Sequence, residues 1–329
     1  MSSPYISVII TVYNRTQYVN EAINSVLNQT LNKDKYEIIV VTNVDLPERE
    51  GVRIIKSRDR WLGPKIAQGI EEAKGEIISL LEDDDLFLHN KLEVVYKIFK
   101  ENEQIRFLKN PIKYVNESGK EWFDPLPEKP IIIEPKDLNL NKLSEIVKKY
   151  KIGFNNSSLT FRKKDIYEYL NYLREVKLSV DTFIAFVFLF RYKTIIWNQH
   201  LSIYRFLSIS SSHDLLNLDR YIERKSFLTR ILYEDYATTY KVLKNSGFDE
   251  ILERFVNFWK INAKLWSKNP SEIKVALKDV FNSMPLDNPR YPRRLILLAY
   301  LASFLPYFIK KRTIYKRSYK RELEGLKNN

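Results

Sequence analysis

An apolar run that ends in four consecutive acids limits the folds open to this chain more than any other feature. Residues 75–81 read Gly-Glu-Ile-Ile-Ser-Leu-Leu, and Glu82, Asp83, Asp84 and Asp85 follow directly. A short, mostly apolar run of this kind is typical of a buried parallel strand. The acids would then lie at the carboxyl end of that strand, where open α/β sheets bind ligands.

The acidic run also indicates a chemistry. Four adjacent carboxylates repel one another strongly in a low-dielectric cleft. A divalent cation with oxygen ligands offsets this repulsion, and Mg²⁺ or Mn²⁺ prefers one or two carboxylates together with substrate phosphates. The alternative is a solvated acidic turn in which Asp85 caps the next helix, and the residues alone leave both interpretations open.

Strands and helices alternate in the first part of the chain. Runs rich in β-branched residues predict strands at 6–12, 36–41 and 52–55. Apolar residues at helical spacing predict helices from the turn at 13–16 to about Gln29 and over about 63–73. The alternation predicts an α/β fold with a mostly parallel sheet and right-handed crossovers.

The pattern changes to helices alone from about Leu218. Before that point the sequence predicts strands at 106–114, 153–161, 194–197 and 201–205, helices at 138–150, 163–174 and 181–192, and an irregular stretch with four prolines at 122–137. After it, helices are expected at 218–245, 248–268 and 270–284. We therefore divide the chain into an α/β domain, 1–215, and an all-helical region, 216–329.

Three stretches carry a specific resemblance. They are ISVIITVYNRTQYVNEAINSVLNQT from Ile6, YEIIVV from Tyr36 and GPKIAQGIEEAKGEIISLLEDDDLFLHNKLE from Gly63. In order, spacing and residue type they resemble a family 2 glycosyltransferase of the GT-A fold. The resemblance implies a Rossmann-like sheet with helices on both faces. It also implies a nucleotide-sugar half over about 1–115 and an acceptor half over about 116–215.

The same resemblance implies an activity and a metal. Members of this family transfer a sugar from a nucleoside-diphosphate sugar, usually with inversion, so a role in glycan biosynthesis is expected. Asp84 falls on the metal-binding aspartate, and Glu82 stands where the first acid of the motif is usually Asp. Whether Glu82 or Asp83 contacts the ribose stays open. His213 is a further candidate metal ligand, and the expected cofactor is Mn²⁺ or Mg²⁺.

Asp181 is the candidate general base. It corresponds to the second acid of the family's Glu-Asp pair, with Val180 at the first position. An inverting transfer needs a carboxylate that takes the proton of the acceptor hydroxyl. The alternative is an ordinary helix N-cap, a position that Asp fills well. Asn155 and Asn156, in a small polar stretch, are candidate acceptor contacts.

The turn after the first strand is implied to hold the nucleotide, through Thr11, Tyr13, Asn14 and Arg15. Tyr13 could stack on the base, and a buried tyrosine in a turn is the alternative. Asn43 and Lys65 are further candidate nucleotide-sugar contacts, although a solvated lysine would fit Lys65 equally well. Because Thr42 and Asn43 replace two acids that the family usually has, the identity of the base stays open.

The positive charge of the chain is concentrated in its tail. The net charge is +13. Residues 290–329 hold eleven Lys and Arg and two Glu, a net +9, so the remaining residues carry only about +4. This distribution indicates an anionic surface near the tail rather than a nucleic-acid-binding core, and no nucleic acid is expected as a partner.

Within the tail, residues 295–309 form fifteen positions without a charge. As a helix they would extend about 22 Å, less than the roughly 30 Å of a membrane's hydrocarbon core, and Pro306 interrupts them. An in-plane membrane anchor fits better, with basic flanks at 293–294 and 310–312. Four tyrosines would suit such an interface: Tyr300, Tyr307, Tyr315 and Tyr319. A core helix or a contact in a homodimer is the alternative.

The main hypothesis is a metal-dependent inverting glycosyltransferase that acts on a glycan or lipid-linked acceptor. The absence of cysteine and of a signal-like amino terminus predicts a cytoplasmic protein, peripheral at the inner face of the cell membrane. A nucleotidyltransferase is disfavoured because residues 13–16 are not a glycine-rich phosphate loop. A non-catalytic GT-A-like protein that binds nucleotide sugars or membranes stays open, because Thr42, Asn43, Glu82 and Val180 depart from the family pattern.

Overall fold

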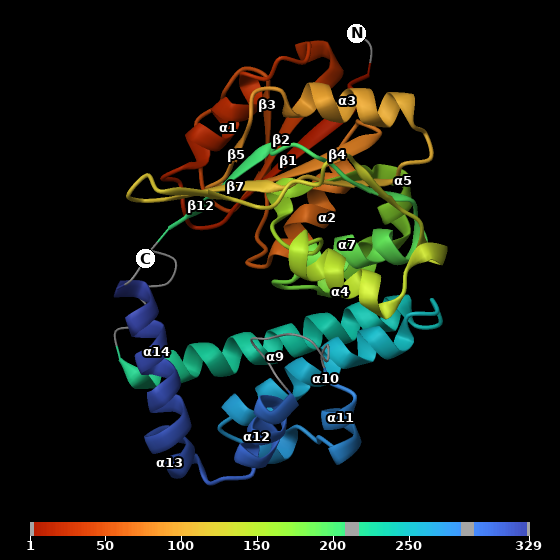
Figure 1. The fold of residues 1–329 in the computed structure, drawn as a ribbon. Coiled ribbons are helices and arrows are strands. Elements are labelled where there is room, and N and C mark those ends of the chain that lie inside the picture. Colours follow the sequence, from red (N-terminus) through yellow and green to blue (C-terminus); the bar gives the residue numbers. More distant parts are fainter. Residues whose placement is uncertain (1–2, 208–216, 284–292, 328–329) are drawn as a thin grey trace. The chain divides into compact units, whose positions relative to one another are not determined.

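A computed structural model describes residues 3–207, 217–283 and 293–327 (Figure 1). The chain forms two compact units, Met1–Phe206 and Leu207–Asn329. The domain boundary predicted after residue 215 falls within 208–216, outside the described residues. The two units are described separately below.

The first unit is built on an eight-stranded sheet. Its strands are β1 (Ile6–Val12), β2 (Tyr36–Thr42), β3 (Val52–Lys56), β4 (Ile77–Glu82), β6 (Phe107–Lys109), β9 (Ile131–Ile133), β10 (Leu159–Arg162) and β11 (Thr194–Ile196). They are arranged in the order β3-β2-β1-β4-β10-β6-β11-β9. Strands β1 to β4 run parallel, and β10 joins β4 in the antiparallel sense. The predicted α/β class with a largely parallel sheet is confirmed.

Helices cover both faces of this sheet (Figure 1). On one face, Val8 of β1 shares a core with Val26 of α1 (Val19–Leu27) and Val95 of α3 (Lys91–Glu101). On the other face, α2 (Leu62–Glu72) approaches so closely that a Cβ on Gly69 would lie 2.6 Å from Ile9 Cγ2. Alternate residues of β1 therefore bury against different helices, which explains why the whole strand is apolar. The remaining helices are α4 (Leu140–Lys149), α5 (Lys163–Ile166), α6 (Leu170–Glu175) and α7 (Val180–Arg191).

A second, four-stranded sheet was not predicted. It consists of β5 (Leu86–Phe87), β12 (Ser202–Phe206), β7 (Ile112–Asn116) and β8 (Glu121–Phe123), in that order. The prediction of one strand over 106–114 was wrong, because the chain leaves the large sheet at Asn110-Pro111 and enters the small one. Proline has no N–H for a ladder hydrogen bond, so it often marks such a break. The stretch at 122–137 likewise holds strand residues in β8 and β9.

The second unit is helical where it is described, as predicted. Its long helices α9 (Leu218–Leu243) and α10 (Asp249–Trp266) pack as a hairpin, joined by a turn in which Asn245 and Gly247 have positive φ. The shorter elements are α11 (Leu277–Phe281), α12 (Arg293–Ser303), α13 (Tyr307–Lys310), a π-helical turn (Lys311–Tyr315) and α14 (Lys316–Lys327). The prediction of a continuous helix over 270–284 was wrong, because among residues 270–283 only a 3₁₀ turn (Pro270–Glu272) and α11 form.

The tail breaks at Pro306, as predicted, with α12 ending at Ser303 and α13 beginning at Tyr307. Among the described residues, every helix is too short or too polar to cross a bilayer. Of the four tyrosines expected at a membrane interface, Tyr300, Tyr307 and Tyr319 are partly buried against neighbouring helices, and one is fully internal. Tyr315 is fully buried, stacks on Trp266 at 4.6 Å and donates its hydroxyl to Leu265 O.

Arg162 offers a test of how the first unit is held together. Its buried guanidinium donates to Phe99 O at the end of α3 and to Ile105 O before β6. Arg162→Met would leave both carbonyls without these donors, which costs about 1–3 kcal/mol. We expect a lower urea midpoint for the full-length protein, followed by circular dichroism. Lys164→Met, at an exposed position two residues away, should unfold like the wild type, and equal effects of the two changes would contradict this assignment.

Candidate active site

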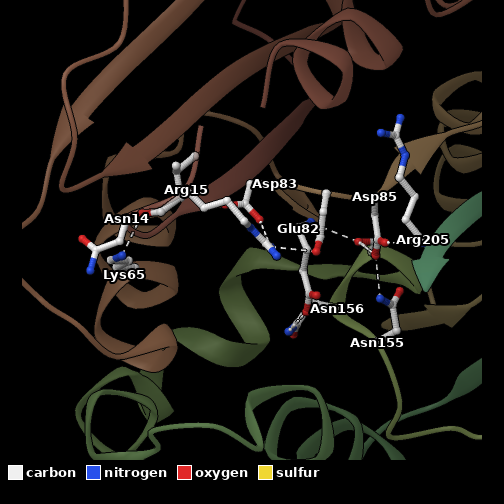
Figure 2. A network of polar contacts seen from close by, with 12 residues as sticks. Asn14, Arg15, Lys65, Glu82, Asp83, Asp85, Asn155, Asn156 and Arg205 are labelled. Carbon is white, nitrogen blue, oxygen red and sulfur yellow. Dashed lines mark hydrogen bonds and ion pairs between the residues drawn. The ribbon is translucent and has the colours of Figure 1, made fainter. Parts of the chain in front are cut away.

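The turn after β1 and the acids after β4 meet at one edge of the sheet (Figure 2). β1 and β4 are parallel neighbours, and Thr11 pairs with Glu82. The carboxyl ends of the two strands therefore lie side by side. Because both strands are buried apolar runs, the polar residues that follow them emerge together at the surface of the sheet edge.

Arg15 connects these two segments. Its guanidinium contacts Asp83 Oδ1 at 2.5 Å and Asp84 Oδ2 at 2.7 Å. Asp83 and Asp84 side chains are 8% and 15% exposed, so the ion pairs are largely shielded from water. The residue predicted to bind nucleotide thus lies against the acids and partly neutralises them.

Three of the acids form a cluster that could hold a metal ion. One oxygen each from Glu82, Asp84 and Asp85 lies within 4.8 Å of the others. Burial raises the pKa of Glu82 well above its ordinary value, and the neighbouring Asp85 raises it further. Burial, followed by the charge of Asp84, raises the pKa of Asp85 to about 7. A hard divalent cation among these oxygens would relieve that repulsion, so the donor set fits Mg²⁺ or Mn²⁺.

Asp85 does not cap a helix, and that alternative is wrong. α3 begins only at Lys91, and the Asp85 carboxylate is completely buried. It accepts hydrogen bonds from Asn155 Nδ2 at 2.6 Å, Ser157 Oγ at 2.6 Å and Arg205 N at 3.1 Å. Asp85 is a member of the acidic cluster, and its hydrogen bonds link the segment after β4 to the loop before β10 and to β12 (Figure 2).

The loop before β10 joins the acids to Asp181. Asn155 donates through Nδ2 to Asp85 and through its backbone N–H to Asp181 Oδ2 at 2.8 Å. Asn156 Nδ2 donates to Glu82 Oε1 at 2.9 Å. The φ of Asn155 is +66°, in the left-handed region, and this conformation allows the loop to face both carboxylates. The two predicted acceptor contacts thus lie between the metal-type cluster and the candidate base.

Both asparagines also carry an unsatisfied oxygen. Asn155 Oδ1 and Asn156 Oδ1 are buried and have no hydrogen-bond partner among the described residues. A buried amide oxygen without a partner is costly. These oxygens leave acceptor capacity at the site that a bound cation, water or hydroxyl group would satisfy.

Asp181 lies in the first turn of α7, where Ser179 is the N-cap residue. Protein surrounds the carboxylate closely, yet part of the residue reaches solvent. Burial raises the pKa of Asp181 to about 6. Its oxygens accept from the backbone N–H groups of Asn155 and Thr182. A simple N-cap would not need this raised pKa or the link to Asn155, whereas a general base benefits from a pKa near the working pH.

A cavity of about 380 Å³ opens beside Arg15. It is lined by Thr11, Val12, Tyr13, Arg15, Leu62, Lys65, Glu82 and Asp83. Lys65 is buried rather than solvated, donates to Val12 O at 2.7 Å and lies 4.3 Å from the centre of the Tyr13 ring. Burial lowers the pKa of Lys65 to about 8. Tyr13 is 44% exposed, so the alternative of a buried turn tyrosine is wrong and its ring is open to a ligand.

Asn14 lies between the cavity-lining residues Tyr13 and Arg15 in the sequence, and it is hydrogen-bonded to Asn43. Asn43 Nδ2 donates to Asn14 Oδ1 at 2.5 Å, and Asn14 N donates to Asn43 Oδ1 at 3.0 Å. The positive φ of Asn14, +55°, is a conformation that asparagine tolerates better than most residues. His213, the further candidate metal ligand, lies outside the described residues.

Two buried lysines under the site were not predicted. Lys91 Nζ donates to Ser157 O at 2.6 Å and to Asn110 Oδ1 at 3.2 Å. Lys109 Nζ donates to Phe154 O at 3.1 Å and also contacts Ser158 Oγ. Both lysines therefore hold the 154–158 loop in place through hydrogen bonds from their buried ammonium groups. An isolated lysine in a strand or helix gives no local signal of such a role, since its partners lie 45 to 66 residues away.

Comparison with known proteins places this geometry in a family. The profile of glycosyl transferase family 2 matches residues 7–170. An uncharacterized glycosyltransferase of Rickettsia bellii is 38% identical over 125 residues, and MJ1057 of Methanocaldococcus jannaschii, also an uncharacterized glycosyltransferase, is 30% identical over 142. These matches cover 35% and 39% of this chain but only 18% and 49% of the two relatives.

Solved structures agree in fold. Residues 1–349 of Staphylococcus aureus TarS match with a TM-score of 0.61 at 12% identity, over 97% of this chain and 92% of that chain. The same TarS segment in complex with UDP-GlcNAc matches with a TM-score of 0.58 at 14% identity and the same coverage. At this identity the likeness shows the GT-A-like fold alone. The family profile that matches residues 7–170 is what makes this chain a member of glycosyl transferase family 2.

Proposed function

We propose that the protein is a metal-dependent inverting glycosyltransferase that uses a nucleoside-diphosphate sugar. The observation that carries the proposal is the connection of two carboxylate sites through Asn155. On one side of it lies the cluster of Glu82, Asp84 and Asp85, and on the other lies Asp181. An inverting transfer requires these two parts, one for the leaving diphosphate and one for the acceptor proton.

The donor would occupy the cavity beside Arg15. Tyr13 offers an exposed ring for the base, and the Asn14–Asn43 pair offers amide groups at its edge. Arg15 and Lys65 supply positive charge toward the diphosphate, and Glu82 or Asp83 can accept from a ribose hydroxyl. A TarS segment that shares this fold has been solved with UDP-GlcNAc, which supports a nucleotide sugar as the donor class.

Asp84 is the proposed principal metal ligand, with Glu82 within reach and His213 as a further candidate. Asp85 is less available because three donors already occupy its oxygens. A bound Mg²⁺ or Mn²⁺ supplies positive charge that stabilises the departing diphosphate. Arg15 would have to release Asp84 as the metal-bound donor enters, since its guanidinium holds that carboxylate here.

Asp181 would accept the proton of the acceptor hydroxyl. As the acceptor oxygen forms its bond to the anomeric carbon, the bond from that carbon to the diphosphate breaks, and the nucleoside diphosphate leaves with the electron pair. Attack from the face opposite the leaving group inverts the anomeric centre. A glycan or a lipid-linked saccharide is the proposed acceptor class.

We also propose that the second unit holds the protein at an anionic membrane surface, at the cytoplasmic face of the cell membrane. Six large apolar side chains on α12, α13 and the turn between them are 39% to 62% exposed: Leu297, Leu298, Leu301, Phe304, Leu305 and Phe308. Ile296, on the opposite side of α12, is buried against α10 residues such as Phe258. α12 therefore has one face in the core and one open apolar face.

Charge favours a bilayer as the occupant of that face. The following π-helical turn and α14 expose Arg312, Lys316, Arg317, Lys320 and Arg321. Exposed apolar residues beside a basic helix are the combination that binds anionic lipid surfaces, with each base contributing about 1 kcal/mol. Lys310, one of the basic flanks expected at the interface, is instead buried and donates to Leu265 O and Ser267 O.

Donor binding can be tested by thermal stabilisation with UDP-, GDP-, dTDP- and CMP-sugars, with and without Mn²⁺. A ligand that binds only the folded protein raises its stability, by about 2.7 kcal/mol at a hundredfold excess over Kd. We expect a Mn²⁺-dependent shift with one nucleotide that disappears in Asp84→Ala. Asp34→Ala, which removes an exposed acid away from the cavity, should keep the shift. A shift that persists in Asp84→Ala would remove the metal role from Asp84.

The role of Asp181 can be tested by the pH dependence of transfer. Because its pKa is raised to about 6, Asp181 is an active base above that pH and becomes protonated below it. We expect kcat/KM to fall about tenfold per pH unit below pH 6 and to level off above it. Asp181→Asn should keep donor-induced stabilisation but lose about 10²–10⁴ in kcat. A variant with unchanged kcat would favour the non-catalytic alternative.

Membrane binding can be tested by flotation with phosphatidylcholine vesicles, with and without phosphatidylglycerol. We expect binding to the anionic vesicles only, and about tenfold weaker binding for the pair Leu301→Ser and Phe308→Ser, since each removes apolar surface from the lipid. Ile132→Ser, at an equally exposed position in β9, is the matched control. If the double variant instead converts a dimer to a monomer in light scattering without changing flotation, the face is a dimer contact.

A further inference from the structure

The small sheet carries a row of aromatic rings across three neighbouring strands. Tyr204 of β12 pairs in register with Tyr114 of β7, and Tyr114 pairs with Trp122 of β8. Residues in register share one face of a sheet. The Tyr204 and Tyr114 ring centres lie 5.7 Å apart, and Tyr114 stacks on Trp122 at 5.4 Å with an angle of 3° between their planes.

The row begins beside the candidate active site. Phe154 packs against Tyr204 at 5.7 Å and immediately precedes Asn155, which contacts both Asp85 and Asp181. Tyr204 itself precedes Arg205, whose backbone N–H donates to Asp85. From this end the rings lead outward to Trp122 on β8, where Phe206 adds a further ring at 6.1 Å. The row is thus continuous with the carboxylates that the proposed reaction uses.

Three of its rings are open to a ligand, whereas Tyr204 is half-buried and Tyr114 is buried between its neighbours. Phe154 is 39% exposed, Trp122 is 37% exposed and Phe206 is 38% exposed. β8 is the outer strand of its sheet, and all three of its residues are exposed. An outer strand usually presents polar side chains to water, and adjacent exposed aromatic rings mark a binding surface instead. The donor base has its own exposed ring at Tyr13, so this row is available for another molecule.

The chemistry around the rings favours a saccharide. A sugar ring has an apolar face of C–H groups, which packs on an aromatic ring, and a rim of hydroxyls, which needs polar partners. Lys151 supplies such a group, since its Nζ donates to Tyr114 Oη at 2.8 Å and to Asp124 Oδ1 at 2.7 Å while 40% of its side chain stays exposed. The exposed rings lie at both ends of the row, so a ligand that contacts all of them must be longer than one sugar.

We propose that the exposed rings of this row, Phe154, Trp122 and Phe206, bind a saccharide acceptor several sugars long, together with the half-buried Tyr204. The buried Tyr114 would support Trp122 from within the sheet and would not contact the sugar. This inference rests on the proposed glycosyltransferase function and gives it an acceptor class. The sugar nearest Phe154 would place its hydroxyl toward Asp181, and the preceding sugars would stack outward toward Trp122. A single sugar would reach only part of the row and bind more weakly.

The test measures binding of linear hexasaccharides of glucose, mannose, xylose and N-acetylglucosamine to the full-length protein by isothermal titration calorimetry. We expect at least one to bind, its monosaccharide to bind more weakly, and Trp122→Ala to weaken binding about tenfold. Phe123→Ala is the matched control: Phe123 is the next residue on β8, faces the opposite side of the sheet and is 54% exposed. It should bind like the wild type, and both variants are checked for unchanged thermal unfolding.

Two outcomes overturn the proposal. One is that no hexasaccharide binds, or that polyprenyl phosphate in detergent micelles binds and the saccharides do not. The other is an equal loss in Trp122→Ala and Phe123→Ala. A second measurement distinguishes failure of the aromatic-row proposal from failure of the proposed function. It follows release of nucleoside diphosphate from the donor by the wild type, with Mn²⁺ and without acceptor. Release without saccharide binding refutes only the aromatic row, whereas saccharide binding without donor binding or release refutes the glycosyltransferase function.

Discussion

The repulsion among the carboxylates after β4 is the constraint around which the first unit is arranged. Every acid has a partner: Arg15 contacts Asp83 and Asp84, Asn156 contacts Glu82, and three donors surround Asp85. These contacts neutralise the cluster only in part, and the pKa values of Glu82 and Asp85 stay raised. The remaining negative potential is what makes the edge suitable for a divalent cation and a diphosphate.

The 154–158 loop makes this arrangement possible. Its conformation is unfavourable, and contacts from buried residues of the same unit stabilise it. Residues 155–158 of the loop are buried, Asn155 has a positive φ, and two amide oxygens have no partner among the described residues. Lys91 and Lys109 support it through hydrogen bonds to its backbone and to Ser158. Burying two ammonium groups is unfavourable, and burial lowers the pKa of Lys109 to about 7. Strained backbone and buried charged groups of this kind are typical of functional sites, where the geometry is kept although it destabilises the fold.

Sequence patterns predicted the strands that deliver the site but not the contacts that complete it. β1, β2 and β4 are short, nearly continuous runs of buried apolar residues, and this continuity together with β-branched enrichment predicts them as strands. The hydrogen bonds of Asp85 join residues 70 to 120 positions away, so no local pattern signals them. The small sheet escaped prediction as a unit for a related reason, because β5 and β8 are short and β12, although predicted as a strand at 201–205, pairs with β5 and β7 across long separations. Only the resemblance to a known family gave Asp181 a role in advance.

In the second unit, composition identified the apolar stretch of the tail but not which of its neighbouring side chains are buried. The uncharged stretch at 295–309 was recognisable from sequence as a surface-seeking or core helix. Of the residues near it that were expected at the surface, Arg312 is exposed, whereas Tyr315 and Lys310 are buried. Tyr315 and Lys310 are buried because each satisfies its polar atom on backbone carbonyls near Leu265. The side chains that are exposed along α12 and α13 are instead leucines and phenylalanines. The proposed contact with an anionic membrane surface is based on this exposed apolar face and on the basic helix that follows it.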